Sequence, residues 1–309
     1  MAAKLTSDDY KDGQGIPFMA LEGEGDSAKF TLTQEAKDFL MGLKAPIAIA
    51  AIVGRYRTGK SFLVNRMLLD LCGSGFQVGA TVNSCTKGLW LWNRPLKVKL
   101  QDGSDINLLV VDTEGIGSLD ADADHDAKIF ALALLLSSYF IYNSVGSIDE
   151  TALNNLSLVV ELTKHIRTKA SHESDGAEES GAEFASFFPS FLWVVRDFAL
   201  QLVDENGVAF SSKQYLERSL TPVSGFSEGV EVKNRIRRML QAFFPSRDCV
   251  TLKRPVEDES MLQKIDQADW GELRPEFVQQ VQVLTYLCKP NNLHRFEPAP
   301  INRVFTDAG

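Results

Sequence analysis

Cysteine is scarce in this chain of 309 residues. The four cysteines are Cys72, Cys85, Cys249 and Cys288, and they form neither a C-x-x-C pair nor a cluster with zinc spacing. The four histidines, which we expect on helix faces or the surface, are His125, His165, His172 and His294. These patterns exclude disulfide-rich and zinc-finger classes and favour a reducing compartment, so we predict a cytoplasmic location.

A long hydrophobic run is also missing. The first 15 residues, MAAKLTSDDYKDGQG, contain no apolar core of the signal-peptide type. The most apolar stretch, residues 130–142, is too short to span a bilayer and is interrupted by Ser137 and Ser138. We therefore expect no membrane segment in this chain.

Positive charge is in deficit. The chain has 32 Lys and Arg against 41 Asp and Glu, a formal net charge of -9. This balance excludes a general attraction to nucleic acid or anionic lipid, although a local basic pocket is still allowed. The 44% hydrophobic and 24% charged content is that of a globular protein, and the length suits two domains or one enlarged domain.

Strand-like and helix-like segments alternate along most of the chain. Apolar periodicity predicts strands at residues 47–54, 89–92, 96–100, 106–111, 139–142, 191–195 and 249–252, and helices at 33–43, 62–71, 130–136, 150–167, 212–220, 230–243 and 276–287. Residues 1–29, rich in Gly, Asp and Ser, predict a flexible N-terminal segment, and the acidic residues 168–186 predict a mobile surface loop. The alternation indicates an α/β fold with a doubly wound, mostly parallel sheet.

The strongest motif is Gly54-Arg-Tyr-Arg-Thr-Gly-Lys-Ser61, which matches G-x-x-x-x-G-K-[ST] between a predicted strand and a predicted helix. Such a match arises by chance in about 1 in 100 chains of this length, so the motif predicts a phosphate-binding loop. Its backbone N–H groups would surround a polyphosphate, Lys60 would reach the terminal phosphates, and the Ser61 hydroxyl would bind Mg²⁺.

A second motif follows about 50 residues later. The apolar stretch 108–111 ends in Asp112-Thr-Glu-Gly115, a D-x-x-G pattern. Asp112 could hold Mg²⁺ through water and the Gly115 N–H could contact a γ-phosphate. Alone this pattern would indicate only an acidic turn, but together with the phosphate loop it predicts a magnesium-dependent phosphate site.

The base-reading residue is harder to predict. No N/T-K-x-D motif follows a late strand, and the strand at 191–195 ends instead in Arg196-Asp197. A carboxylate there could accept hydrogen bonds from guanine N1–H and N2–H₂, which adenine cannot donate. From the residues alone, a surface ion pair at the strand end is an equally good interpretation.

Several segments together resemble the guanylate-binding protein family of large, dynamin-related GTPases. The resemblance rests on GRYRTGKS, the stretch GATVNSCTKG at 79–88, DTEG, the run from Phe130 to Leu156, the Arg-Asp strand end and FFPSRDCVTLKRPV. It implies one large GTPase domain over residues 30–309, a Ras-like P-loop fold with helices on both faces of the sheet, enlarged by insertions. It also implies that Arg196 and Asp197 recognise guanine.

The resemblance implies catalytic roles for Arg57, Lys60, Ser84 and Glu114. Arg57 matches an arginine finger that acts in cis when two domains dimerise through the nucleotide face. Ser84 matches a position that orients the attacking water, and Glu114 one that holds that network. Cys85 stands where the family often has histidine.

Further implied positions complete the site. The metal ligands would be Ser61, Thr86 and Asp112. The nucleotide contacts would be Gly54, Arg55, Tyr56, Arg57, Thr58, Gly59, Lys60, Ser61, Phe62, Val78, Gly79, Ala80, Asp112, Thr113, Glu114, Gly115, Arg196 and Asp197. Residues 253–261 resemble a loop that covers the base. Arg55 is expected to face solvent and Tyr56 to pack within the loop.

The expected function is Mg²⁺-dependent binding and hydrolysis of GTP, with nucleotide-driven homodimerisation and GDP, or GDP and GMP, as products. The alternative is a nucleotide-gated dimerising scaffold with little hydrolysis, which the Cys85 change favours. Phosphate release that rises with protein concentration would support the enzyme.

Overall fold

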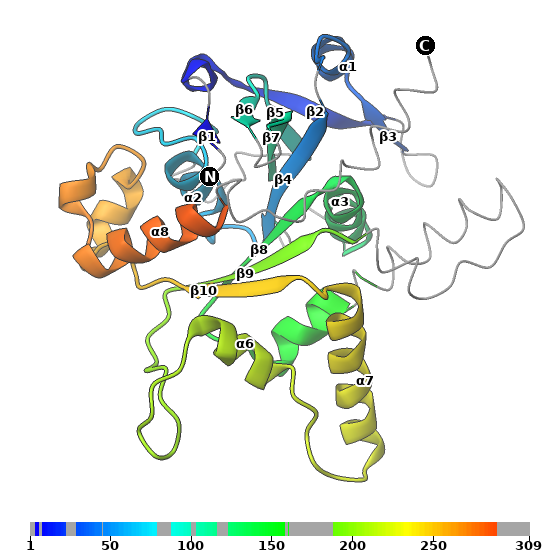
Figure 1. The fold of residues 1–309 in the computed structure, drawn as a ribbon, viewed down its shortest axis with the longest axis vertical. Coiled ribbons are helices and arrows are strands. Elements are labelled where there is room, and N and C mark those ends of the chain that lie inside the picture. Colours follow the sequence, from blue (N-terminus) through cyan, green and yellow to red (C-terminus); the bar gives the residue numbers. More distant parts are fainter. Residues whose placement is uncertain are drawn as a thin grey trace, which may run out of the picture.

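A computed structural model of the chain describes residues 4–5, 8–22, 29–44, 46–78, 88–99, 103–115, 123–157, 160 and 188–288. They form one mixed sheet of ten strands with helices on both faces (Figure 1). The strands are β1 (Lys4–Leu5), β2 (Gly15–Glu22), β3 (Lys29–Leu32), β4 (Ile47–Gly54), β5 (Leu89–Trp92), β6 (Leu96–Lys99), β7 (Asp105–Thr113), β8 (Tyr139–Val145), β9 (Ser190–Arg196) and β10 (Arg247–Thr251). The helices are α1 (Gln34–Met41), α2 (Lys60–Met67), α3 (Ala123–Leu136), α6 (Ser212–Ser219), α7 (Glu228–Phe243) and α8 (Pro275–Cys288), with short 3₁₀ turns η1 (Asp9–Asp12), η3 (Glu259–Lys264) and η4 (Trp270–Glu272).

Five parallel strands form the centre of the sheet in the order β10-β9-β8-β4-β7. All eight residues of β4 are buried, as expected of a central strand covered on both faces. The order reverses about β4, because β7 and β8 lie on its two sides. The sequence prediction of a doubly wound Ras-like sheet is therefore confirmed, and a ligand site is expected at the carboxyl ends of these strands.

An antiparallel extension continues the sheet beyond β7. Strands β5, β2 and β3 follow one another, while β6 pairs with β7 and β1 pairs with β6. The predicted hairpin between residues 96–100 and 106–111 is the pair β6 and β7.

The N-terminal segment differs from the flexible segment predicted for residues 1–29. Residues 15–22 are strand β2, which lies within the sheet between β5 and β3. Ile16 and Phe18 are buried, and the register shifts between Pro17 and Met19. Every second side chain thus enters the core, and the irregularity accommodates a proline that cannot donate to a sheet ladder.

Two hydrophobic layers cover the faces of the sheet. One contains apolar residues of α2 and α8, packed on Ala48, Ala50 and Ile52 of β4. The other contains residues of α1, α3, α6 and α7, packed on the alternate side chains of the same strand. The helix that follows the glycine-rich loop therefore rests against a rigid central strand.

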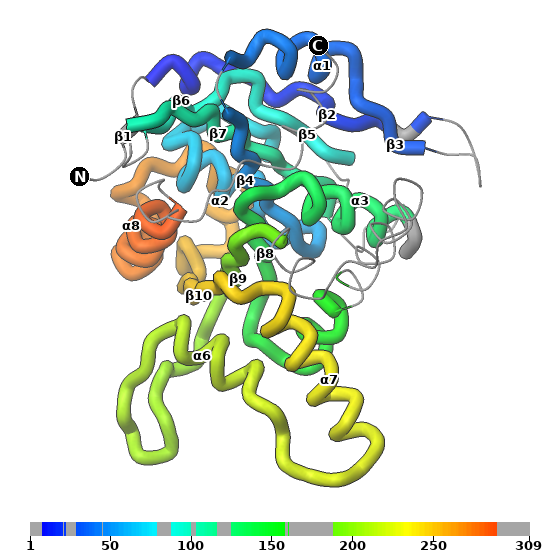
Figure 2. The backbone as a smooth tube through the Cα atoms, turned by 45° about the vertical axis from the view of Figure 1, so that its right-hand side comes forward, coloured from blue at the N-terminus to red at the C-terminus, as the bar shows by residue number. Residues whose placement is uncertain are grey.

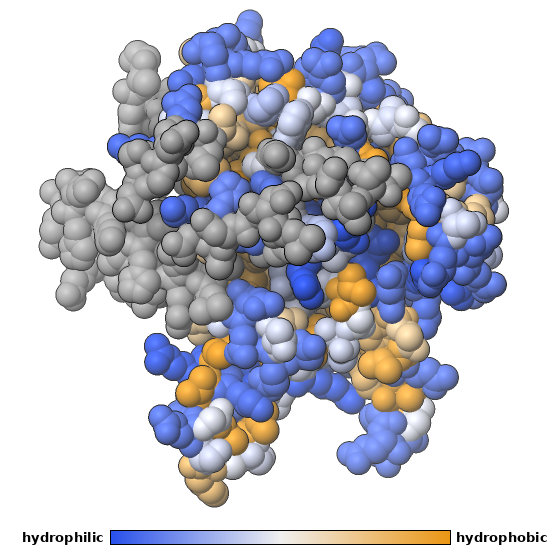
Figure 3. All heavy atoms as spheres, turned by 180° about the vertical axis from the view of Figure 1, so that it is seen from behind, coloured by the Kyte–Doolittle hydropathy of each residue, from blue (hydrophilic) through white to orange (hydrophobic). Residues whose placement is uncertain are grey.

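Helices α6 and α7 form a projecting end of the molecule next to β10 (Figure 2). The segments before and after α6 carry exposed apolar side chains, which are visible on this end in Figure 3. They are Leu200, Val203 and Val208 in the first segment, and Val223 and Phe226 in the second. This end lies at the opposite edge of the sheet from β3.

Two sequence-level expectations concern membranes and thiols. Within the described residues, no helix combines the length and the apolar character that crossing a bilayer requires. Cys72, Cys249 and Cys288 are free thiols, and Cys85 lies outside the described residues.

The predicted acidic loop at 168–186 also lies outside the described residues. The same holds for much of the helix predicted at 150–167, of which residues 150–157 are described and helical.

An ion pair ties α7 to the helical residues 150–157. The buried Arg237 guanidinium binds both carboxylate oxygens of Glu150, and this hydrogen bonding lowers the pKa of Glu150 below its usual value near 4.5. We expect Glu150→Gln to reduce the free energy of unfolding at pH 7 by about 1 kcal/mol. Because the lowered pKa stabilises the fold only while Glu150 is ionised, the difference should shrink as pH falls below about 4.5.

Urea unfolding of both proteins at pH 7 and pH 4 measures this effect. Glu231→Gln is the matched control, since its pair with Arg238 on the same helix is 3.0 Å long but exposed. That variant should unfold like the parent protein. A Glu150→Gln difference that stayed constant with pH would contradict the assigned pairing.

Candidate functional site

The glycine-rich loop lies at the carboxyl end of the central strand. β4 ends at Gly54 and α2 begins at Lys60, so the residues between them form the turn that the motif predicts. The neighbouring strands β7 and β8 bring Thr113 and Asn143 to the same edge, because Asn143 pairs with Gly54 and β7 runs parallel to β4. The two predicted phosphate motifs therefore meet at one edge of the sheet.

Two glycines of the motif are required by close backbone contacts. Gly54 has φ +155°, and a Cβ there would lie 2.0 Å from the Asn143 carbonyl oxygen. Gly59 has φ +72° and caps α2 in the left-handed conformation without a side-chain hydrogen bond. The first turn of α2 thus presents N–H groups that no capping side chain occupies, which is the usual anion-binding arrangement.

The two loop arginines project outward. Arg55 and Arg57 are both exposed, and Arg57 has a left-handed φ of +63°, which is uncommon for a residue other than glycine. Half-buried Tyr56 packs within the loop, where its Cα would lie 2.1 Å from a Cβ at Gly115. The loop backbone therefore rests directly on the D-x-x-G turn.

Lys60 is a buried cation at the start of α2. Its Nζ donates to the Arg55 carbonyl oxygen at 3.3 Å. Burial lowers the pKa of the ammonium from its usual value near 10.5, while the charges of Asp112 and Glu114 act in the opposite direction. A polyphosphate bound at the loop would favour the charged form further.

Ser61 and Asp112 form the oxygen pair predicted to hold a metal ion. The Ser61 hydroxyl donates to Asp112 Oδ2 at 2.5 Å, linking α2 to the end of β7. A hydroxyl and a carboxylate are ligands that suit Mg²⁺, which normally keeps several waters and adds phosphate oxygens. Among the described residues, no group of three or more His, Cys, Asp or Glu is positioned to hold a metal ion.

Glu114 holds the chain at Gly88, directly after the segment 79–87. The Gly88 N–H donates to Glu114 Oε2 at 2.8 Å, and the Glu114 N–H donates to the Gly88 carbonyl oxygen at 2.7 Å. Ser84, Thr86, Gly79 and Ala80, whose site roles are implied by the family resemblance, lie outside the described residues. Glu114 thus anchors the end of the segment that carries them.

His125 is a site neighbour that sequence reasoning missed. Its Nε2 lies 3.3 Å from Glu114 Oε2, and its ring lies 5.7 Å from that of Phe30. Nothing in the local sequence signals this contact, because the two residues meet only once α3 packs on the sheet against β4. His125 therefore supports the carboxylate that sequence analysis places in the water-orienting network.

We expect His125→Leu to lower the turnover number for GTP several-fold while leaving the affinity for GDP within about twofold. The reason is that Glu114 would lose one of the groups that fix its carboxylate, whereas the phosphate loop would be untouched. Steady-state phosphate release and fluorescent-nucleotide titration measure the two quantities. An unchanged turnover number would show that His125 does not contribute to hydrolysis.

Strand β9 ends at Arg196, and Asp197 is the first residue after it. The buried Arg196 guanidinium lies under the phosphate loop, with Nη1 3.3 Å from the carbonyl oxygens of Thr58 and Gly59 and its Cζ 5.8 Å from the Phe277 ring centroid. Burial lowers the pKa of Arg196. Asp197, by contrast, is exposed with φ +54°. The arginine contacts the loop and the aspartate faces solvent beside it.

The other residues predicted to contact the nucleotide are held by contacts within the domain. Phe62 is buried in the core beneath α2 and Val78 is half-buried against the same core, whereas Thr113 donates from Oγ1 to the Ile52 carbonyl oxygen at 2.8 Å. Within the predicted base-covering loop, the Lys253 N–H donates to Gln280 Oε1 at 2.6 Å and Met261 packs on the core. These contacts fix one end of that loop to α8.

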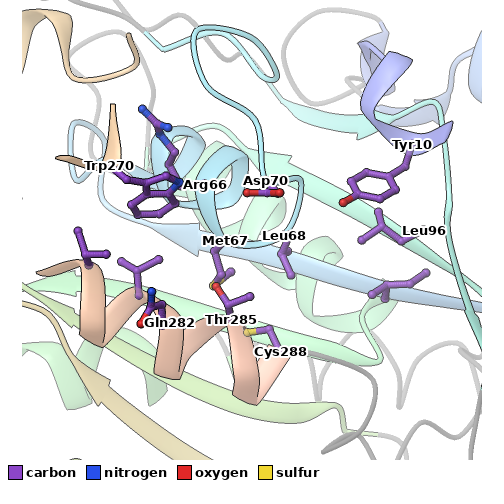
Figure 4. Close-up of a pocket in the computed structure, with 13 residues that line it drawn as sticks. Tyr10, Arg66, Met67, Leu68, Asp70, Leu96, Trp270, Gln282, Thr285 and Cys288 are labelled. Atoms are coloured by element: carbon purple, nitrogen blue, oxygen red, sulfur yellow. Dashed lines mark hydrogen bonds between the residues drawn. The ribbon is translucent and has the colours of Figure 1, made fainter. Parts of the chain in front are cut away.

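A separate cavity of about 570 Å³ lies at the C-terminal end of α2, between that helix and α8 (Figure 4). It is lined on one side by Arg66, Met67 and Leu68 at the end of α2. On the other side, α8 contributes Thr285 and Cys288. No residue of the loop from Gly54 to Ser61 lines it, so this cavity is distinct from the predicted phosphate site.

Comparisons with known proteins agree with this geometry. The family model described as the guanylate-binding protein N-terminal domain matches residues 27–295. Human guanylate-binding protein 6 is 40% identical over 261 residues, which cover 84% of this chain and 40% of that protein. Mouse guanylate-binding protein 2 is 41% identical over 263 residues (85% of this chain, 43% of that protein), and human guanylate-binding protein 1 is 41% identical over 262 residues (84% and 43%).

The chain spans about two fifths of the length of these curated relatives, and the match falls on their shared N-terminal part. The matched range includes the phosphate loop, the D-x-x-G turn and the Arg-Asp strand end. The chain belongs to the guanylate-binding protein family, and its described residues form the α/β domain of that family's N-terminal part.

Proposed function

We propose that this chain binds GTP with Mg²⁺ and hydrolyses it to GDP, in a dimer formed through the nucleotide face. The observation that carries the proposal is the meeting of the loop 54–61 with Asp112 at the carboxyl edge of the sheet. Family membership supports the choice of a guanine nucleotide.

The phosphates would lie at the first turn of α2. Gly59 leaves the N–H groups of that turn without a side-chain cap, and Lys60 supplies a buried positive charge. Backbone dipoles and one lysine suit phosphate oxygens better than a diffuse basic surface does, which agrees with the net charge of -9.

Ser61 and Asp112 would hold Mg²⁺, with Thr86 as a further ligand from the segment anchored by Glu114. When bound, the ion supplies positive charge that offsets the negative charge of the phosphates. The 2.5 Å bond between Ser61 Oγ and Asp112 Oδ2 keeps both oxygens on the same side of α2.

The base would be read by Asp197. A carboxylate accepts both N1–H and N2–H₂ of guanine, and Asp197 is exposed beside the loop. Arg196 supports this arrangement from below, since its guanidinium contacts the loop carbonyls. The two residues of the Arg-Asp pair therefore have different tasks, one with the base and one with the loop.

Arg57 would supply positive charge to the transition state after dimerisation. In the single chain its side chain is exposed, and a left-handed backbone holds it on the outer side of the loop. Covering by a second domain would remove water from this charge and strengthen its effect on the γ-phosphate. Ser84 and Glu114 are the residues proposed to orient the attacking water.

The proposal is tested by incubating the chain with Mg²⁺ and GTP, GDP or ATP, and separating the products by chromatography over a range of protein concentrations. GTP consumption whose rate per protein rises with concentration is the expected result. Formation of GMP would show a second cleavage. Tight GTP binding with concentration-dependent dimerisation but no product would instead support the nucleotide-gated scaffold.

A further inference from the structure

Asn143 ends the row of buried residues in β8, one strand away from the phosphate loop. Its side chain is completely buried, and its backbone pairs with Gly54. No motif in the sequence draws attention to it, since it lies in the apolar segment YFIYNSV. The structure nevertheless places it directly behind the loop.

The Asn143 carboxamide holds the loop by two hydrogen bonds. Nδ2 donates to Thr58 Oγ1 at 2.7 Å and to the Thr58 carbonyl oxygen at 3.1 Å. The Thr58 hydroxyl in turn donates to the Arg55 carbonyl oxygen at 2.7 Å. A chain of hydrogen bonds therefore runs from β8 to both sides of the turn.

Arg196 completes the support from β9. Its Nη1 lies 3.3 Å from the Thr58 and Gly59 carbonyl oxygens, so Thr58 is held from two neighbouring strands. Carbonyl groups bound from behind cannot rotate toward the phosphates, where their negative ends would repel the ligand. The opposite ends of these peptides remain available to an anion.

The burial of these polar groups makes an unfavourable contribution to the stability of the fold. Asn143 Oδ1 and Arg196 Nε are both buried, and neither has a hydrogen-bond partner among the residues that the structure describes. Such groups destabilise a fold relative to apolar side chains of similar shape. Polar side chains at these two positions are better explained by what they do to the loop than by stability alone.

We propose that Asn143 is a positioning residue for the phosphate loop, acting through Thr58 together with Arg196. The proposal deepens the proposed function, on which it rests: Asn143 sets the geometry of the loop before the nucleotide arrives and touches no part of the nucleotide. Loss of its amide should therefore loosen residues 54–60 in the nucleotide-free protein and weaken diphosphate binding.

The test uses the full 309-residue chain and the variants Asn143→Ala and Ser144→Ala. Ser144 is the matched control, because its hydroxyl accepts from Trp193 Nε1 at 2.8 Å on the same strand but away from the loop. Two quantities are measured: amide hydrogen exchange of residues 54–62 without nucleotide, and affinity for a fluorescent GDP. Thermal unfolding of each variant reports the general effect on stability.

Asn143→Ala is expected to weaken GDP binding about tenfold, the factor expected from losing one to two hydrogen bonds, and to speed exchange in the loop. Ser144→Ala should stay within about twofold of the parent in affinity with unchanged loop exchange. Unchanged exchange and affinity in Asn143→Ala, or equal effects in Ser144→Ala, would overturn the proposal.

Thr58 variants test the same contact from the loop, even if Asn143→Ala does not fold. Thr58→Val removes the hydroxyl at constant shape and should mimic Asn143→Ala, whereas Thr58→Ser keeps the hydroxyl and should restore affinity. Asn143→Ala should add less than its tenfold in the Thr58→Val background, because one of its two hydrogen bonds to Thr58, the one to the hydroxyl, is already lost there. Fully multiplicative effects would refute action through Thr58.

The failure of the proposed function would be recognised separately. If the parent chain bound no guanine nucleotide, that proposal would fail, yet loop exchange in the nucleotide-free variants would still decide the role of Asn143.

Discussion

Replacing Arg57 with alanine is expected to reduce steady-state phosphate release from GTP by about 10³-fold or more, with little change in nucleotide affinity. The affinity should persist because the side chain is exposed in the single chain and the first turn of α2 is unaffected. The rate should collapse because an arginine finger stabilises charge that develops only in the transition state. Phosphate release and fluorescent-GDP titration on the same preparation separate the two effects.

Arg94→Ala is a suitable control for the loss of one exposed arginine outside the loop. It should leave both quantities as in the parent. Equal turnover in Arg57→Ala and the parent would exclude the finger, whereas a matching loss of affinity would make Arg57 a ground-state binding residue instead.

Asp197→Asn is expected to weaken GTP and GDP binding by about 10²-fold or more, since the carboxamide keeps only one acceptor oxygen and its NH₂ group would face the second guanine donor. Asparagine is the informative substitution because it tolerates the left-handed backbone at φ +54°, so the loop should keep its shape. Competition titration with GDP, ADP and xanthosine diphosphate measures the effect.

Xanthosine diphosphate provides the internal control. Its base carries an oxygen where guanine carries the 2-amino group, so it can accept from the side-chain amide that Asp197→Asn introduces. Xanthosine diphosphate should therefore bind that variant better than GDP does. If Asp197→Asn kept the parent's preference for GDP, the base would be read by another residue.

The phosphate part of the site could be predicted from sequence because its residues are close together in the chain. The loop from Gly54 to Ser61 needs glycines at fixed spacing for backbone reasons, and the structure shows the close contacts that require them. The partner Asp112 was predictable because it lies at the end of a buried strand, and parallel strands end at one edge.

The supporting residues could not be predicted in the same way. Asn143, Arg196 and His125 act through contacts with residues 11 to 138 positions away, and each contact depends on strand order and helix packing. The Arg196-Asp197 pair was visible in the sequence, but only the structure shows that the arginine turns to the loop. The local sequence pattern shows which chemical group a position carries, whereas the tertiary fold determines which residues that group contacts.

The N-terminal strand was missed for a different reason. Gly15 and Pro17 in the stretch GIPFMALE are residues typical of turns, yet the alternation of Ile16 and Phe18 is the pattern of a half-buried strand. The helices were easier, since their apolar residues recur at helical spacing over two or more turns. A short alternation flanked by turn residues is a weaker signal than helical periodicity over several turns.

The position of β2 between β5 and β3 matters for how the domain is delimited in practice. A version that started at residue 30 would leave the outer edge of β5 with unpaired backbone groups and would uncover the apolar side chains on which Ile16 and Phe18 rest. Open strand edges of that kind recruit other chains and promote aggregation. Any shortened version meant for crystallisation or calorimetry should therefore retain residues 9–22 as part of the folding unit.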